Sequence, residues 1–319
     1  MAPLCIILLF LLFVAPPAFS TQEKEETIQI AEHLSIAIKT ERMIDSHTSY
    51  EFGYPFSPYQ APLSRLEFPL DSWWGGAELR AIFPRFSFGL EVLTNMSQEA
   101  DGGMRDSDWD DEDNPDLKTI YSESKCRLEQ SYVLNADVDM KISDWLGLPK
   151  WLDLRPVAGF RWQNFNFVTH DGIQFELGEP PLLLHGDGIS FEQTYAQYFV
   201  GMRAALDMGR RLKLKSLAML AQFDWAYVEG HNKDHHLLRE GIRYTFEDTT
   251  GHAWHGSIGL KAGLLKQFSI GLEADFLSIS TEGSHRLVNP PFDIDLTWSN
   301  GVEVWSYQNR IALMLQYVF

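Results

Sequence analysis

The stretch Phe268-Ser-Ile-Gly-Leu-Glu-Ala-Asp-Phe276 alternates apolar and polar side chains at every step. Successive side chains of an extended strand point to opposite faces, so all its large apolar residues share one face and both its acids share the other. Acids at regular inward positions are tolerated where the interior is polar, as in a membrane barrel. A soluble sandwich that buries one face and wets the other gives the same local pattern. The stretch therefore predicts strands and leaves both folds open.

The spacing of turns and polar stretches favours the barrel. The alternation recurs in Arg85-Phe-Ser-Phe-Gly-Leu-Glu-Val92. Short turn signals recur near 83–85, 146–149, 208–211 and 265–267, and longer polar stretches cover about 46–62, 96–118, 169–192, 229–250 and 281–300. Tight turns at one end and long loops at the other are typical of outer-membrane barrels. Five long loops predict an all-β fold, a ten-stranded antiparallel transmembrane β-barrel with long extracellular loops.

The two ends of the chain indicate export to the bacterial outer membrane. An apolar run from Leu4 to Val14 precedes two prolines and the small-residue exit Ala18-Phe-Ser20, so we expect a signal peptide at 1–20. The remaining residues, 21–319, form one barrel domain in this interpretation, with outer-membrane lipid around it. The last stretch, Ile311-Ala-Leu-Met-Leu-Gln-Tyr-Val-Phe319, resembles the insertion signal of bacterial outer-membrane barrels, because it alternates and ends on an aromatic residue.

Composition argues against nucleic acid as a partner, against a helical membrane span and against a disulfide. The net charge of −18 disfavours nucleic acid as a partner. After the signal no run of 18 apolar residues occurs, so no helical membrane span is expected. Cys126 is the only cysteine left after the signal, which predicts a free buried thiol rather than a disulfide. The oligomeric state is left open, with a monomer favoured.

An acidic stretch, Met104-Arg-Asp-Ser-Asp-Trp-Asp-Asp-Glu-Asp-Asn-Pro115, follows one of the strand-like runs. In an extended backbone Asp106 and Asp108 point to the same face. Two carboxylates held that close raise one pKa and can share a proton, so the pair can polarise water or bind a hard cation. The alternative is a solvated acidic loop.

A second polar stretch, Asp234-His-His236, rises to a similar height. Asp106 lies about 22 residues beyond the turn near Pro84 and Asp234 about 24 beyond the turn near Gly209, so both project above a membrane and can face each other across the barrel mouth. Asp234 beside His236 on one face would raise the imidazole pKa and orient a general base. A zinc site and an uninvolved polar loop are the alternatives.

These residues resemble the omptin family, bacterial outer-membrane proteases with a ten-stranded barrel. The acidic stretch is similar to the first omptin active-site loop, and Val228-Glu-Gly-His-Asn-Lys-Asp-His-His236 is similar to the second. Further similarity lies at 63–68, 136–145 and 191–201. The resemblance implies that Asp234 orients His236 and that the nucleophilic water sits between His236 and Asp106. Asp108 completes the acidic pair and stabilises the oxyanion when protonated.

The chain departs from the family pattern at the substrate and lipid positions. Family members specific for basic residues carry an acid two positions before the active-site Asp, where this chain has Asn232. Glu51 is the candidate for a second substrate-binding acid. The lipopolysaccharide pattern Tyr-x-Glu-x-Arg corresponds to Phe160-Arg-Trp-Gln-Asn164, which lacks the Glu and the Arg, so lipopolysaccharide as a cofactor is doubtful and no other cofactor or metal is expected.

The sequence thus predicts a cell-surface endopeptidase that acts on peptide or protein substrates, with Asp106, Asp108, Asp234 and His236 as catalytic residues. A non-catalytic barrel, acting as an adhesin or a narrow porin, is the alternative from another functional class. A soluble β-sandwich is a third.

Overall fold

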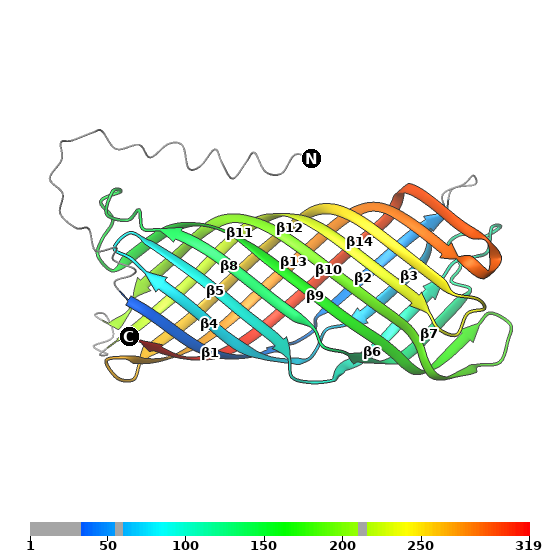
Figure 1. Cartoon of the computed structure of the whole chain (residues 1–319), viewed down its shortest axis with the longest axis horizontal. Helices are drawn as coiled ribbons and strands as arrows, with labels where there is room; N and C mark the ends of the chain where they lie inside the picture. Colours follow the sequence, from blue (N-terminus) through cyan, green and yellow to red (C-terminus); the bar gives the residue numbers. More distant parts are fainter. Residues whose placement is uncertain (1–32, 55–59, 210–215) are drawn as a thin grey trace. The chain divides into compact units, whose positions relative to one another are not determined.

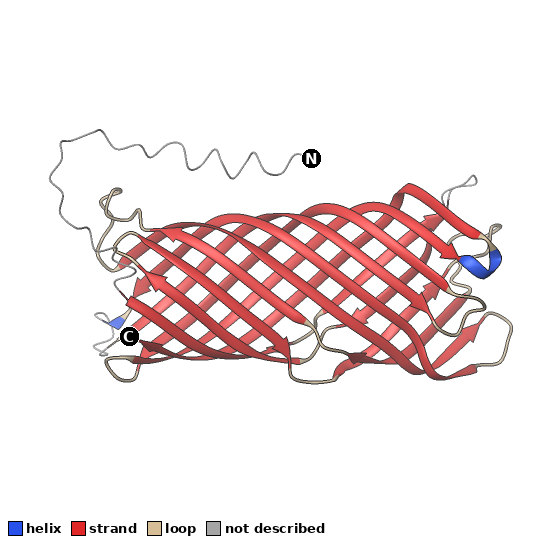
Figure 2. Cartoon of the chain, in the orientation of Figure 1, coloured by secondary structure: helices blue, strands red, loops and turns tan. Residues whose placement is uncertain are grey.

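The computed structural model describes residues 33–54, 60–209 and 216–319, almost entirely as strands (Figure 2). Residues Ala31–Phe319 form one compact unit. The predicted signal peptide at 1–20 lies outside the described residues, as do parts of the first polar stretch and of the turn near 208–211. No helix of the described residues is long and apolar enough to cross a membrane.

Within the described residues, fourteen strands and one short 3₁₀ helix follow one another. They are β1 (His33–Met43), β2 (His47–Tyr54), β3 (Gln60–Pro69), β4 (Trp73–Ile82), β5 (Phe86–Asn95), β6 (Glu99–Asp108), β7 (Ile120–Leu128), β8 (Tyr132–Met140), β9 (Leu152–Glu176), β10 (Leu182–Asp207), β11 (Leu217–His236), β12 (Arg243–Gly263), β13 (Phe268–Asn289), η1 (Pro290–Phe292) and β14 (Ile294–Val318).

The strands close into a barrel ten strands around, as the sequence predicted. One ring runs β1-β4-β5-β8-β9-β10-β11-β12-β13-β14, and β14 pairs with β1 to close it. At the other end of the barrel β2, β3, β6 and β7 replace β1, β4, β5 and β8 between β14 and β9 (Figure 1). All pairings between these strands are antiparallel. We call the end that carries β2, β3, β6 and β7 the distal end, and the opposite one the turn end.

Four wall strands are interrupted where the two rings meet, at 44–46, 70–72, 96–98 and 129–131. A serine hydroxyl binds local backbone at each interruption; Ser72 Oγ, for example, donates to the carbonyl of Leu70 at 2.8 Å. Such local bonds compete with the strand ladder. Three of the interruptions also exchange the inward and outward faces of the strand. At 44–46, for example, the odd-numbered Glu41 is buried in β1 before the interruption, whereas the even-numbered Tyr50 is buried in β2 after it.

The polar stretches lie at the distal end, but most of their residues are strand rather than loop. The connections there are 109–119, 177–181, 237–242 and 290–293, with 55–59 outside the described residues. The predicted loops at 169–192, 229–250 and 281–300 are therefore corrected to strand ends joined by short connections. Above the apolar belt a strand meets water outside and a polar site inside, so it loses the alternation that identifies strands in sequence.

Apolar side chains cover the outside of the barrel toward the turn end. Phe88, Val200 and Leu272 are each more than half exposed although large and apolar. The alternate residues point inward and are polar or charged, as predicted from 268–276 and 85–92. An apolar exterior over a polar interior is the pattern of a strand wall in lipid.

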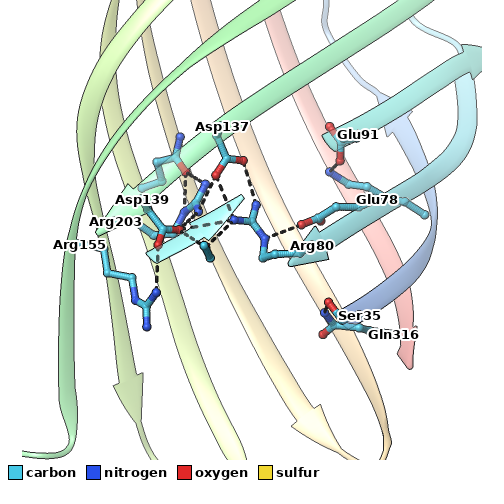
Figure 3. Close-up of polar contacts among 12 residues, drawn as sticks. Ser35, Glu78, Arg80, Glu91, Asp137, Asp139, Arg155, Arg203 and Gln316 are labelled. Carbon is cyan, nitrogen blue, oxygen red and sulfur yellow. Dashed lines mark hydrogen bonds and ion pairs between the residues drawn. The ribbon is translucent and has the colours of Figure 1, made fainter. Parts of the chain in front are cut away.

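Charged side chains fill the interior near the turn end. Asp139 contacts three guanidinium groups, with Arg203 at 2.6 Å, Arg155 at 2.9 Å and Arg80 at 3.4 Å (Figure 3). Asp137 also pairs with Arg80 and Arg203. Buried charges require such partners, because an unpaired one costs several kcal/mol. The network links strands on different parts of the wall.

Candidate active site

The two acidic motifs project into the barrel from different walls of its distal end. Asp106 and Asp108 belong to β6, and Asp234 and His236 belong to β11. On β11 the even-numbered residues from Ala226 onward face the interior, so Asp234 and His236 point inward together. These four residues are the ones predicted from sequence.

Asp234 is fully buried and holds two partners on one oxygen. The hydroxyl of Tyr50 donates to Asp234 Oδ2, and His236 Nε2 lies 3.2 Å from the same oxygen. Burial raises the pKa of Asp234, but His236 and the Tyr50 hydrogen bond outweigh it and hold that pKa below its ordinary value. Asp234 is therefore a carboxylate at neutral pH.

His236 is held in one orientation by this contact. Burial lowers the pKa of its imidazole, but the charge of Asp234 and their hydrogen bond raise it above 6.5 overall. With Nε2 directed at Asp234, the tautomer protonated on Nε2 is favoured, which leaves Nδ1 to accept a proton. A histidine in this state is suited to general-base chemistry.

The charges of Asp234 and His236 also act on Asp106. Burial first, and the negative charge of Asp108 second, raise the pKa of Asp106 to about 7. His236 acts on this pKa in the opposite sense and Asp234 in the same sense. Asp106 Oδ1 is buried without a hydrogen-bond partner among the described residues. The two motifs, more than a hundred residues apart in sequence, thus act on one another.

We call Asp234 and His236 the dyad. A layer of aromatic rings lies next to the dyad inside the barrel. Tyr50 stacks on Phe191 at 5.3 Å between ring centroids, and Phe191 stacks on Phe68 at 4.3 Å and on Phe167 at 6.0 Å. All four side chains are almost fully buried. The apolar surroundings explain why burial is the largest single cause acting on the pKa of each of the two acids, Asp106 and Asp234.

The sequence did not reveal a row of polar residues two positions deeper along β11. Register partners on four adjacent strands are Gln193, Asn232, Glu247 and His285. Each is at least nine-tenths buried, and Glu247 Oε1 lies 2.8 Å from His285 Nδ1. Asn232 could be placed on the inward face from the sequence, because it lies two residues from Asp234. Its neighbours on the other strands depend on the register between strands, which cannot be read from the sequence.

The structure does not bring Glu51 to this site. Glu51 lies on the face of β2 opposite to Tyr50, and its carboxylate accepts a hydrogen bond of 2.6 Å from Arg65 Nε. The Arg65 guanidinium also lies over the rings of Trp109 and Trp305. The substrate-binding prediction for Glu51 is therefore corrected: it belongs to a cluster outside the barrel interior. Asn232, by contrast, lies on the same face as Asp234.

Two other predictions concern nucleophiles and metals. Cys126 is buried and free, as predicted, and burial raises the pKa of its thiol to about 12. A thiol with that pKa is a poor nucleophile at neutral pH. Within the described ranges no group of three or more His, Cys, Asp or Glu side chains is arranged to hold a metal ion.

Comparison with known proteins adds the family. The sequence profile of the Omptin family matches residues 75–319, which is more than half of the chain. The chain belongs to the omptin family. This family of outer-membrane proteases was indicated by the two motifs and the barrel. No curated protein sequence matches closely enough to count as a relative.

Solved structures support the same fold for this omptin. The crystal structure of the outer-membrane protease OmpT from Escherichia coli matches with a TM-score of 0.78 at 15% identity, covering 90% of this chain and 97% of that chain. The translocator domain of the autotransporter NalP from Neisseria meningitidis matches with a TM-score of 0.36 at 8% identity, covering 91% of this chain and 90% of that one. The first match shows the omptin barrel, and the second carries no weight.

Proposed function

We propose that this omptin is an outer-membrane endopeptidase that cleaves peptide or protein substrates by water attack, with its site facing the cell exterior. The observation that carries the proposal is the mutual electrostatic influence of Asp106 and His236 across the barrel interior, with Asp234 fixing the imidazole. Membership of the family supports it.

In the proposed reaction His236 Nδ1 takes a proton from a water that Asp106 orients. The water oxygen attacks the scissile carbonyl, and the carbonyl oxygen becomes an oxyanion. Asp106 has a pKa of about 7, so near neutral pH the pair of Asp106 and Asp108 retains a proton that it can donate to the oxyanion as a hydrogen bond. His236 then returns its proton to the leaving amine, and the peptide bond breaks.

Asp234 stabilises the imidazolium formed during this cycle. Its carboxylate lies 3.2 Å from His236 Nε2, and its lowered pKa keeps it ionised while His236 is protonated. The mechanism forms no covalent intermediate, because its nucleophile is water and not a side chain. It uses no metal and no cofactor, and we propose that a monomer suffices.

A mixed peptide library incubated with the refolded protein, with and without lipopolysaccharide, tests the proposal. Cleavage by the wild type that is absent from Asp106→Ala and His236→Ala supports it. Undiminished cleavage by both variants overturns the mechanism. An intact library in every sample favours the non-catalytic barrel instead.

A further inference from the structure

We infer that Gln193, Asn232 and Glu247 form a subsite that binds a side-chain carboxamide of the substrate, glutamine or asparagine, beside the scissile bond. The inference rests on the proposed peptidase function and names its substrate class. We call these three residues the amide row. They are register partners on β10, β11 and β12.

The amide row lies next to Asp234 and His236 along the barrel interior. Asn232 and Asp234 share the inward face of β11, two residues apart, which is about 6–7 Å along the strand. Asn232 is the deeper of the two, because β11 rises from the turn end to the distal end. A side chain that descends from a peptide bond held beside His236 therefore meets Asn232.

The row presents unpaired donors and acceptors. Both amide atoms of Asn232, Oδ1 and Nδ2, are buried and have no hydrogen-bond partner among the described residues. The same is true of Gln193 Nε2, whose Oε1 is occupied by the Thr48 hydroxyl at 2.6 Å. Buried polar groups in folded proteins are nearly all paired. These atoms are thus suited to a ligand that both donates and accepts.

A carboxamide supplies that combination. Its NH₂ can donate to Asn232 Oδ1, and its carbonyl oxygen can accept from Asn232 Nδ2 or Gln193 Nε2. An ammonium or guanidinium group only donates, so it leaves both amide NH₂ groups unpaired. A carboxylate only accepts, and it also meets the negative charge of Glu247.

Glu247 adds an acceptor to the row, beside the unpaired NH₂ groups of Asn232 and Gln193 that disfavour a cation. Its Oε1 lies 2.8 Å from His285 Nδ1, and the His285 ring is stacked against Phe52 at 4.5 Å between centroids. Both carboxylate oxygens of Glu247 nevertheless lack a hydrogen bond of normal geometry among the described residues, so Glu247 can accept the second N–H of a carboxamide. Replacing Asn232 by Asp adds a second acid beside Glu247, and this change should convert the subsite to one for cations.

The test compares kcat/KM for four matched peptide sets that carry Gln, Met, Lys or Glu at each position around the cleaved bond. We expect one position at which the wild type prefers Gln over each of the other three by roughly tenfold or more. Asn232→Leu should remove the preference over Met, and Asn232→Asp should favour Lys. Lys233→Asp, one residue away on the outward face, should keep the wild-type order.

The outcomes separate the two proposals. Cleavage without a Gln preference at any position overturns the subsite and leaves the peptidase intact. A Gln preference that survives in Asn232→Leu also overturns it. No cleavage of any set by heat-modifiable, folded protein overturns the peptidase and the subsite together. The substrate preference of the wild type can by itself overturn the subsite, so the test holds even where a variant does not fold.

Discussion

Tyr50 and His236 meet the same oxygen of Asp234, Oδ2, although Tyr50 belongs to β2 and the other two to β11. Burial and the neighbouring carboxylate of Asp234 raise the pKa of Tyr50 well above its ordinary value, so its hydroxyl stays protonated and remains a donor at neutral pH. The tyrosine is itself stacked on Phe191. The orientation of the proposed base thus depends on a side chain from a distant wall strand.

Tyr50→Phe should slow peptide cleavage without preventing it. Removing a hydrogen bond to a charged group costs about 1.5–3 kcal/mol, and we expect kcat to fall roughly tenfold or more while KM changes little. The pKa of Asp234 should also rise. Steady-state kinetics over a pH series measure both effects. Tyr198→Phe, on the outward face, serves as the control; equal kinetics in the two variants would remove the role given to Tyr50.

Asp106→Asn should stabilise the folded barrel at alkaline pH. The pKa of Asp106 is raised from 3.8 to about 7, so its ionised form is disfavoured in the folded state. The cost appears as the pH rises from about 4 to 7 and persists above, whereas the amide never ionises. Urea unfolding in detergent should give the variant a higher midpoint at pH 8 and an equal one at pH 4. A wild-type midpoint as high as that of the variant at pH 8 would contradict the shift.

Asp108→Asn should move the activity profile toward acid. Asp108 is the second cause, after burial, of the raised pKa of Asp106, so its removal lowers that pKa. If the acid pair must hold a proton, the alkaline limb of kcat/KM falls near 7 in the wild type and at lower pH in the variant. If the alkaline limb of kcat/KM falls at the same pH in the variant as in the wild type, a group other than Asp106 titrates at that pH.

The interior network near the turn end should govern stability and not cleavage. Asp139→Asn removes the charge that faces Arg80, Arg155 and Arg203, which should destabilise the barrel by about 3–5 kcal/mol. Asp144→Asn, which breaks an exposed pair with Lys141, should cost less than about 1 kcal/mol. Unfolding midpoints measure both, and the folded Asp139→Asn protein should cleave peptides at the wild-type rate. A rate that falls in folded protein would place the network within the site.

The sequence predicted the parts of the fold that alternation controls. Strand segments of the apolar belt, such as residues 268–276 of β13, alternate because one face meets lipid and the other a polar interior. Beyond the belt the inward face mixes aromatic and polar side chains and the outward face meets water, so the strand ends at the distal end read as loops. The ten-strand count was still correct, because it depended on the number of turns rather than on strand length.

The placement of the four proposed catalytic residues on shared faces was predictable because the two on each strand lie two positions apart. Asp234 and His236 share a face whatever the register, and so do Asp106 and Asp108. Glu51 was not predictable in this way. The interruption at 44–46 exchanges the inward and outward faces, so Glu41 is buried inside while Glu51 pairs with Arg65 outside. Tyr50 and Glu247 were missed because Tyr50 reaches Asp234 only across the closed barrel, and Glu247 lies beside Asn232 only through the register of β11 and β12.

Peptide cleavage by His236→Ala is the decisive measurement for the role of His236 as general base. It is made on protein that shows the heat-modifiable migration of a folded barrel. We expect cleavage of every peptide in the library to be lost, because His236 is the group proposed to take the proton of the attacking water. Cleavage at the wild-type rate by the folded variant would contradict this role.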